Sequence, residues 1–570
     1  MNRLIQKIFE NRGYTHEFLR EFDNPEYQQL KDIDVLCQKL KSIKDNNQNI
    51  VVYPDFDMDG IASGVLGYAG LSELGFNVGL YIPDPTEGYG ISQQSVADLL
   101  YKYPGTNAII TCDTGIGAAE AASYCKIAGV DFLVTDHHKQ EMIIQAPIIV
   151  DPMRADETYP HQICGAFVFW QVLARYAQLY CTYFEQDQIG RLKVFAGIGT
   201  VSDSMPILYE NRQTVRDAIS ICRMIYSDGT TGMVSSIMGC DRYKLVFWGL
   251  YDFFKICEEN GIISSSEDID EEFFGWYLAP IFNSAKRMNG EMYKAFGIFF
   301  YGNTCDVNPR QEFAEYLYKL NHERKELVAK KLHEALSFDQ PFAPYVYISD
   351  ADPGILGLLA MKLLQKNGVP TFVLKDYGEN NKPNRYSGSG RSPEWFNSIT
   401  LLSNVDYLFI AGHEQAFGCG IKTATDLQRF HDWLAVLVPD MMSKLDTAEG
   451  KPDYVIDTHW QNGDIGIDIT CFQGYLEEIE EYRPFGKGFE KPVGIIKFTN
   501  TDIIEWKRMG SNKQHLKLSL PGGFNILCWN QGHLIDQRDK FESHTVVGSL
   551  GQSTFKGITS INFTGEFVEQ

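Results

Sequence analysis

Short apolar runs alternate with helix-like segments in the first part of the chain. Four apolar, β-branched runs lie at 50–53, 108–112, 130–134 and 147–150. Helix-like segments rich in small residues follow the first two runs, at 61–74 and 118–128. Strands that alternate with helices predict an α/β fold with a parallel, doubly wound sheet. In such a sheet, ligands bind beyond the carboxyl ends of the strands.

The remainder of the chain predicts more helix, a second α/β region and a small β-domain. Residues 317–336 combine alternating charges with an apolar stripe, which indicates a long connecting helix. A strand–helix–strand pattern follows at 345–349, 355–365 and 371–374. Near the C-terminus, short alternating runs such as 515–520 are separated by Gly-containing turns, and they predict a small antiparallel barrel.

These patterns divide the chain into five parts. They are an N-terminal helical segment at 1–47, a parallel-sheet α/β domain at 48–215, a helical region with the connecting helix at 216–338, a second α/β domain at 339–440, and a linker with the barrel-like domain at 441–570.

Composition limits the class of protein more than its function. The chain has 570 residues, of which 44% are hydrophobic, and this is enough for several cores. Its 12 cysteines include no CxxC pair, so we expect neither a zinc knuckle nor a disulfide framework, but the reduced thiols of a cytoplasmic protein. The N-terminus lacks the apolar core of a signal peptide, and no apolar run is long enough for a transmembrane helix, so no membrane association is expected.

The formal net charge of −23 admits two interpretations. Phosphate backbones attract basic surfaces, so the first is that the partner is not a polyanion. The second is that the acidity lies on outer faces and in a metal site, while a local basic groove holds a nucleic acid. Total charge leaves both open, and the motifs must decide.

Carboxylates gather where the predicted strands end. Asp55, Asp57 and Asp59 alternate, so in an extended segment they point to the same side, where they would repel one another unless a cation neutralised them. Further candidate ligands are Asp113, His137 and Asp203. Oxygen ligands suit Mg²⁺ or Mn²⁺, and an imidazole among them favours Mn²⁺. One such aspartate alone more often caps a helix or a turn, but the whole set predicts a metal site.

A paired metal site predicts phosphoester hydrolysis, because it binds a phosphoryl oxygen, lowers the pKa of a bridging water and stabilises the leaving oxygen. His138 follows the candidate ligand His137. A histidine beside a phosphate can donate a hydrogen bond or a proton to developing charge. The alternative is that His138 is a packed histidine that only supports the ligands.

Four motifs resemble, in order, those of the DHH phosphoesterase superfamily. They are DFDMDG (55–60), TCDTG (111–115), TDHH (135–138) and GTVSDSMP (199–206). Later segments are similar to landmarks of the RecJ exonuclease family within it, namely LNHER (320–324), GSGRS (388–392), AGHEQAFGCGI (411–421) and RPFGKGFEKP (483–492). The resemblance therefore implies a DHH domain, a helical connector, a DHH-associated α/β domain and a C-terminal OB-like β-barrel.

The resemblance also implies roles for individual residues. The metal ligands would be Asp55, Asp57, Asp113, His137 and Asp203, and the groups acting around them in catalysis would be Asp59, Asp136 and His138. Substrate phosphate would be bound by Ser389, Arg391, His413 and Arg287. This is chemically sensible, because a Gly-rich turn with a guanidinium makes an anion cradle, although GSGRS alone is also typical of a hairpin turn.

The barrel-like domain would contact the nucleic acid. Its candidate contacts are Trp506, Lys507, Arg508 and Lys517, because aromatic rings and cations together form a sequence-tolerant platform for single strands. Phe524 and Trp529 are further aromatic candidates, with the alternative that both are core residues.

Three segments depart from the family pattern. Ala411 replaces the first of two glycines before His413, Ser284 and Lys286 alter the stretch before Arg287, and Asp352-Pro353 stands where a histidine is common. None removes a candidate metal ligand, so the departures put the grip on DNA in doubt rather than hydrolysis.

The function implied by the resemblance is a 5′→3′ exonuclease specific for single-stranded DNA, releasing 5′-mononucleotides in DNA repair and recombination. Two Mn²⁺ ions, or Mg²⁺ in their place, would be the cofactors. A single-strand-binding protein or a helicase would be the protein partner, and the chain would be a monomer. The alternatives are a DHH enzyme that cleaves nano-RNA or cyclic dinucleotides, an inorganic pyrophosphatase, and a non-enzymatic scaffold. A scaffold tends to lose ligands, whereas every ligand position is filled here.

Overall fold

The computed structural model divides the chain into two compact units. It describes residues 2–15, 17–18, 22, 28–84, 88, 90–140, 144, 148–228, 237, 239–302, 308–337, 339–378, 383–444, 452–458, 466–510, 512–540, 542–555 and 558–567. The central unit comprises residues 28–205 and 214–446, and the terminal unit comprises residues 1–27, 206–213 and 447–570. The expected N-terminal segment 1–47 is thus shared between the two units.

A parallel sheet, the first sheet, begins the central unit and confirms the predicted fold class. Its strand order is β2-β1-β3-β4-β5, and every neighbouring pair is parallel. The strands are β1 (Asn49–Pro54), β2 (Asn77–Leu80), β3 (Thr106–Cys112), β4 (Asp131–Thr135) and β5 (Ile148–Val150). The edge strand β2 is the one that the apolar pattern did not predict.

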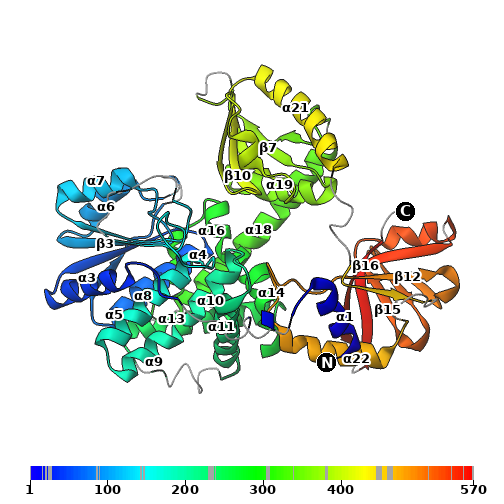
Figure 1. Cartoon of the computed structure of the whole chain (residues 1–570), viewed down its shortest axis with the longest axis horizontal. Helices are drawn as coiled ribbons and strands as arrows, with labels where there is room; N and C mark the ends of the chain where they lie inside the picture. Colours follow the sequence, from blue (N-terminus) through cyan, green and yellow to red (C-terminus); the bar gives the residue numbers. More distant parts are fainter. Residues whose placement is uncertain are drawn as a thin grey trace. The chain divides into compact units, whose positions relative to one another are not determined.

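Alternation along the strands builds a core on each face of the first sheet. Val52 and Ile110 belong to one buried cluster, and their neighbours Val51 and Ile109 belong to another. Figure 1 shows α6 and α7 on one side of β3, and α3 and α8 on the other. The helices are α3 (Ile33–Asp45), α4 (Met58–Val65), α5 (Leu71–Glu73), α6 (Gln93–Lys102), α7 (Ala119–Ala128) and α8 (Gly165–Tyr180).

Helices fill the middle of the central unit, as predicted. They are α9 (Tyr183–Arg191), α10 (Lys193–Ser202), α11 (Tyr209–Asp228), α13 (Asp241–Glu259), α14 (Glu271–Phe273), α15 (Ala279–Phe282), α16 (Ser284–Arg287), α17 (Met292–Gly297) and α18 (Pro309–Ser337). A π-helical turn, η4 (Phe274–Leu278), lies between α14 and α15, and another, η1 (Leu66–Gly70), lies earlier in the chain between α4 and α5. Helix α18 contains the predicted connecting helix and is longer, because its first turns bury Phe313 and Leu317.

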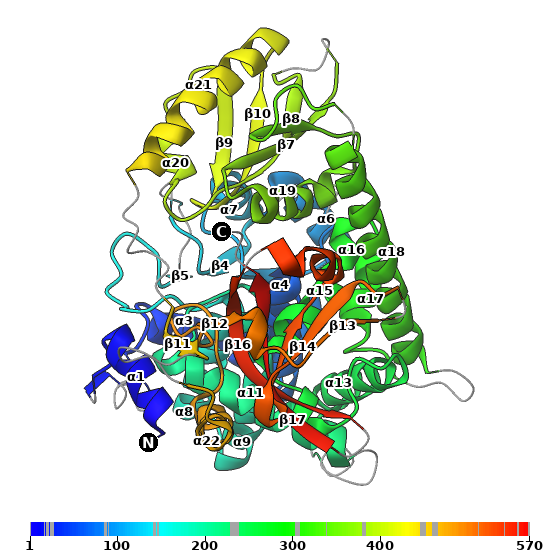
Figure 2. The same cartoon turned by 90° about the vertical axis from the view of Figure 1, so that its right-hand side faces the viewer.

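A second sheet completes the central unit. Its order is β6-β7-β8-β10-β9, with a parallel β6–β7 pair and antiparallel pairs elsewhere. The strands are β6 (Val346–Ile348), β7 (Thr371–Asp376), β8 (Tyr386–Arg391), β9 (Leu408–Gly412) and β10 (Ala416–Ile421). Helices α19 (Pro353–Asn367) and α21 (Ala424–Ser443) cover opposite faces, as Figure 2 shows. The short α20 (Ser398–Leu402) precedes β9.

The terminal unit contains a seven-stranded sheet. Its order is β11-β12-β16-β17-β15-β14-β13, with parallel β11–β12 and β15–β17 pairs and antiparallel pairs elsewhere. The strands are β11 (Tyr454–Asp457), β12 (Gly494–Thr499), β13 (Glu505–Met509), β14 (His515–Ser519), β15 (Asn525–Cys528), β16 (Ser543–Phe555) and β17 (Ile558–Phe567). The antiparallel β-character predicted for this region is confirmed, whereas its two parallel pairs were not predicted.

In the terminal unit, segments that are far apart in the sequence pack against one another. Helix α1 (Arg3–Arg12) packs on α22 (Ile469–Ile479), and Arg12 pairs with Asp453 at 2.6 Å. Arg212 is 1% exposed, stacks 4.0 Å from the ring centre of Phe22, and donates hydrogen bonds to two main-chain carbonyls, those of Tyr482 and Pro484. A buried guanidinium is tolerated there because carbonyls and rings replace its water.

Two further expectations from the sequence concern membrane-spanning helices and disulfide bonds. None of the helices in those residues is long and apolar enough to cross a bilayer. The cysteines among them, most of which are buried, form no disulfide.

Candidate metal centre

The carboxyl ends of three parallel strands meet at one edge of the first sheet. Strand β1 leads to Asp55 and Asp57, β3 leads to Asp113, and β4 leads to His137. Asp113 has φ 61°, a left-handed conformation in which aspartate is one of the few tolerated residues. Asp203 reaches the same place from the carboxyl end of α10.

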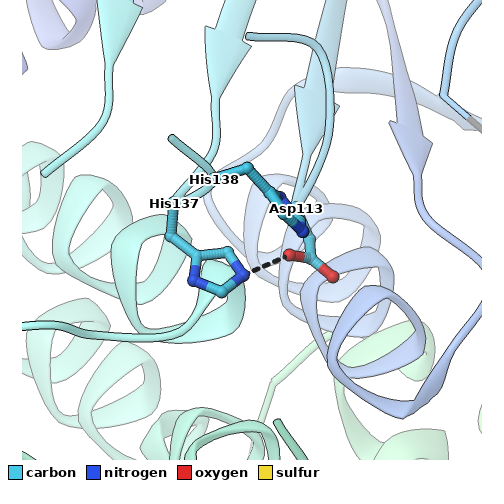
Figure 3. Close-up of side chains that lie close together, drawn as sticks. All are labelled: Asp113, His137 and His138. Atoms are coloured by element: carbon cyan, nitrogen blue, oxygen red, sulfur yellow. Dashed lines mark ion pairs between the residues drawn. The ribbon is translucent and has the colours of Figure 1, made fainter. Parts of the chain in front are cut away.

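The ring of His137 lies at the centre of the group. Its Nε2 atom is 3.0 Å from Oδ1 of Asp113, the contact drawn in Figure 3. The same nitrogen is 3.6 Å from Oδ2 of Asp203 and 3.7 Å from Oδ2 of Asp59. One imidazole is therefore surrounded by three carboxylates that come from three different elements.

The donor set fits divalent cations. Three overlapping groups each have their ligand atoms within 4.8 Å of one another, namely Asp55 with Asp57 and Asp113, Asp59 with His137 and Asp203, and Asp113 with His137 and His138. All of these side chains are buried or half-buried. Oxygen atoms with one or two imidazoles form the ligand chemistry of Mn²⁺ and Mg²⁺ sites.

The electrostatics of the cluster call for positive charge. Burial and the charge of Asp57 raise the pKa of Asp55 to about 7. Burial and Asp59 raise the pKa of Asp113 well above its usual range, and Asp113 Oδ1 accepts no hydrogen bond. Burial lowers the pKa of His137 to about 4, which keeps its ring neutral and able to bind a metal. A cation would remove the repulsion and engage the orphaned oxygen.

Asp59 differs from the other carboxylates because main-chain amides hold it. It accepts hydrogen bonds from the N–H groups of Gly165 at 2.7 Å and Ala166 at 3.1 Å, at the N-terminus of α8. A Cβ atom on Gly199 would lie 2.2 Å from Asp59 Oδ1, so only glycine leaves room there. The carboxylate is fixed at the rim of the ligand group.

Asp136 orients His138. Oδ1 of Asp136 lies 2.7 Å from Nδ1 of His138, and Oδ2 accepts a hydrogen bond from the N–H of Ile116 at 2.9 Å. Burial opposes the ionisation of Asp136, but its hydrogen bond with His138 holds its pKa below the usual range. Burial also opposes the protonation of His138, yet Asp136 raises the pKa of His138 to about 9. The pair therefore presents a cationic imidazole beside the carboxylates.

The motif analysis did not single out Asn283, which supports this edge. Its side-chain oxygen accepts a hydrogen bond of 2.8 Å from the N–H of Met58, the first residue of α4, which lies between Asp57 and Asp59. In the sequence, Asn283 is an asparagine inside a family-like stretch. No spacing pattern links it to Met58, which lies 225 residues earlier.

The structure places several predicted phosphate-binding residues near the acidic group. The rings of His138 and His413 lie 6.4 Å apart with an angle of 24° between them. Burial lowers the pKa of Arg391, and the charge of Arg287 lowers it further. The two guanidinium groups therefore interact electrostatically. Ser389 lies two residues before Arg391 on β8 and shares its side of the strand.

Helix α19 leaves room for Arg391. A Cβ atom on Gly357 would lie 2.8 Å from Nη2 of that arginine. Nη1 of Arg391 donates a hydrogen bond of 2.7 Å to the carbonyl of Gly390. The guanidinium therefore lies against α19, and within the described part of the chain it forms no ion pair with a carboxylate.

The three departures from the family pattern lie in, or directly before, regular helices and strands. Lys286 lies with its Nζ 4.1 Å from the ring centre of Phe56, and its charge opposes the rise in the pKa of Asp55. Pro353 occupies the first turn of α19, directly after Asp352. Ala411 pairs with Gly418 between β9 and β10. Their effect on DNA binding stays a prediction.

The candidate contacts in the terminal unit do not share one face. Lys507 and Lys517 are cross-strand partners, whereas Trp506 pairs with the buried Leu518 on the other face. Arg508, on the same side as Trp506, donates a hydrogen bond to the carbonyl of Gly532.

The two further aromatic candidates also differ. Phe524 is fully buried, as the core alternative expected, whereas Trp529 is 51% exposed and edges onto the ring of His515.

Two family models match the chain. The DHH family, N-terminal domain, matches residues 49–193, and the RecJ OB domain matches residues 468–566. The first range contains the parallel sheet and most of the acidic group, and the second contains six strands of the terminal sheet.

Curated relatives and a solved structure extend the similarity. The single-stranded-DNA-specific exonuclease RecJ of Bacillus subtilis is 26% identical over 555 residues, which cover 93% of this chain and 63% of that protein. The RecJ of Haemophilus influenzae is 24% identical, with 100% of this chain and 96% of that protein covered. The fold matches the crystal structure of RecJ in complex with Mn²⁺ from Thermus thermophilus, with a TM-score of 0.74, 19% identity, and coverage of 100% of this chain and 76% of that one.

Proposed function

We propose that the chain is a metal-dependent nuclease that degrades single-stranded DNA from the 5′ end, because the DHH family model matches residues 49–193 and the RecJ OB domain model matches residues 468–566. The observation that carries the proposal is the cluster of buried carboxylates around the neutral His137, beside an edge that presents Arg391 and Arg287. Binding a cation and a phosphate side by side is what phosphodiester hydrolysis requires.

The chain's own residues divide the work as follows. Asp55, Asp57, Asp113, His137 and Asp203 would hold two divalent ions, Mn²⁺ or Mg²⁺. When bound, such ions supply Lewis acidity to the phosphoryl oxygens and make water a stronger nucleophile near neutral pH. Asp59 keeps the ligand loop rigid through its bonds to α8, and Asp136 keeps His138 cationic.

Positive side chains would position the substrate. Arg391 and Arg287 would bind phosphate oxygens through charge-assisted hydrogen bonds, with Ser389 and His413 contributing further hydrogen bonds. His138 would place its positive charge beside the phosphoryl group as negative charge develops. Because burial excludes water from the carboxylates, each of these interactions is stronger than at the surface.

The finer points of the proposal follow from the resemblance to the RecJ family. They are the 5′→3′ direction, release of 5′-mononucleotides, a role in repair and recombination, and recruitment by a single-strand-binding protein or a helicase. In the terminal unit, Lys507 and Lys517 would contact the backbone of the strand on one face of the sheet.

A digestion experiment tests the proposal. Single-stranded DNA labelled at the 5′ or the 3′ end is incubated with the full chain and Mn²⁺, with duplex DNA, cyclic dinucleotides and short RNA as controls. The proposal expects immediate release of labelled mononucleotide from the 5′ end and little digestion of the duplex. Cleavage confined to dinucleotides or very short RNA would replace the exonuclease with the alternative DHH activity. Absence of any cleavage would contradict both.

A further inference from the structure

An exposed aromatic pair lies on the π-helical turn η4, outside the residues assigned above. Trp276 is 71% exposed and Tyr277 is 39% exposed, whereas Phe274 and Leu278 anchor the turn in the core. Such turns are rare and occur often at functional sites. Trp276 and Tyr277 are adjacent, and Trp and Tyr are among the side chains that contribute most at binding surfaces.

The turn is close to the element that delivers a candidate metal ligand. A Cβ atom on Gly275 would lie 3.5 Å from Cγ1 of Val201, in ordinary van der Waals contact. Val201 is two residues before Asp203, at the carboxyl end of α10. The turn that carries the aromatic pair therefore packs on the end of α10 that leads to Asp203.

A row of cations connects the metal centre with the aromatic pair. Nζ of Lys325 lies 5.8 Å from the ring centre of Tyr277. Its neighbour Arg324 is buried and donates two hydrogen bonds to the side chain of Asn321, at 2.8 and 3.1 Å. Burial lowers the pKa of Arg324 to about 10, and the charge of Arg287 lowers it further. Burial lowers the pKa of Arg287, and the charge of Asp57 opposes that change.

The cations of the row lack acidic partners. Within the described residues, Arg287, Arg324 and Lys325 form no ion pair, whereas Lys319 and Lys331 on the same helix α18 pair with Glu315 and Glu334. In a chain with a net charge of −23, these three neighbouring cations stand out from the paired lysines of α18. Cations that approach one another without counter-charge are suited to a polyanion.

We propose that Trp276 and Tyr277 stack on the bases of nucleotides that lie beyond the scissile bond in a single strand, and that Lys325 binds a phosphate of the same nucleotides. The inference rests on the proposed function and extends it by giving the strand a defined path from the metal centre along α18 to η4. Base stacking on exposed rings beside cations is tolerant of sequence, as a general exonuclease requires.

The test compares substrate lengths. Affinity of the full chain for a long oligothymidylate and for a dinucleotide is measured by competition, together with kcat and KM in Mn²⁺. We expect Trp276→Ala to weaken binding of the long strand by roughly 5- to 100-fold, the usual range for one lost base–aromatic stack. Cleavage of the dinucleotide should be unchanged, because it does not reach the turn. Trp276→Phe should retain most of the affinity.

Matched controls separate this effect from general damage. Tyr183→Ala removes another aromatic side chain, 86% exposed on α9, and should leave both substrates unaffected. Lys325→Ala should reduce the salt dependence of long-strand binding by about one counterion, whereas Lys319→Ala should not.

Three outcomes would overturn the inference. The first is unchanged long-strand affinity in Trp276→Ala. The second is equal loss for long and short substrates, which would make the turn a support of the metal centre. The third is a loss of binding to another protein, or of self-association, with DNA affinity intact. A wild-type chain that binds long strands through Trp276 but cuts none would refute the proposed function and leave the platform standing.

Discussion

The two sheets of the central unit gather opposite charges. The first sheet brings buried carboxylates to the carboxyl ends of β1, β3 and β4, and burial raises the pKa of Asp55 and Asp113. The second sheet presents Arg391, whose pKa burial lowers. In both places the charged form is destabilised by its surroundings.

The two edges differ in the sign of their charge, and this difference indicates a different kind of ligand for each. Neither group of charges neutralises itself, so neither can be explained by the stability of the fold. In the proposed function, a metal cation completes the acidic edge and a phosphate completes the basic edge. The following predictions test whether the two edges are distinct in this way, from the largest expected effect to the smallest.

Asp113→Ala should abolish cleavage and leave the fold intact. Losing a ligand shared by two candidate cation groups removes several kcal/mol of transition-state stabilisation, which corresponds to about a thousandfold or more in kcat. The measurement is single-turnover digestion in Mn²⁺ with circular dichroism as a check on folding. The surface variant Asp187→Ala should behave as wild type, and normal Mn²⁺-dependent activity in Asp113→Ala would refute the site assignment.

Arg391→Ala should weaken substrate binding rather than metal binding. A lost charge-assisted hydrogen bond costs about 1.5–3 kcal/mol, or roughly 10- to 150-fold in KM. Arg391→Lys should restore little, since lysine does not reproduce the planar fork of donors. The control is Arg385→Ala, at the other end of β8, where the arginine pairs with Asp376. Equal losses in both variants would argue against a specific basic edge.

Mn²⁺ should stabilise the wild-type chain against heat through the acidic edge. Binding to the folded state alone adds about 2.7 kcal/mol when the free ion is at a hundred times its Kd. Without the ion, Asp113→Asn should melt at or above the wild-type temperature, because it relieves repulsion among buried carboxylates. Calorimetry with and without Mn²⁺ measures both effects. An Asp113→Asn protein that still gains the full stabilisation would show that the ion binds elsewhere.

Gly357→Ala should produce the smallest effect, confined to the basic edge. The new methyl group would lie 2.8 Å from Nη2 of Arg391, so the guanidinium must shift, and we expect about a tenfold rise in KM. Stability should be unchanged or slightly higher, because alanine favours a helix interior by up to about 1 kcal/mol over glycine. An unaltered KM would mean that the position of Arg391 is not set by α19.

Much of the acidic edge was predictable from local sequence. Each carboxylate follows an apolar run, and parallel strands bring such positions to one edge regardless of the details of packing. The edge strand β2 was missed because Asn77–Leu80 is short and half-exposed, with no apolar run to reveal it. Asn283 was missed because its partner Met58 is distant in sequence.

The terminal unit was harder to predict for a different reason. Trp506 and Lys507 are adjacent in sequence and chemically suited to one platform, yet neighbours in a strand point to opposite faces. Only the register of β13 against β14 shows that Lys507 faces Lys517. Composition can propose a binding surface, but the pairing of strands decides which side chains share it.

The topology of the terminal unit also delays the packing of α1 during biosynthesis. Helix α1 is synthesised long before its partner Asp453, which lies 441 residues after Arg12. At ordinary translation speeds of about 5–20 residues per second, that separation corresponds to roughly 20 to 90 seconds. During this interval the apolar side chains Leu4, Ile8 and Phe9 lack the surface that later buries them. We therefore expect the nascent chain to expose the apolar face of α1 until the residues that bury it have been synthesised, and to need protection from aggregation during that time.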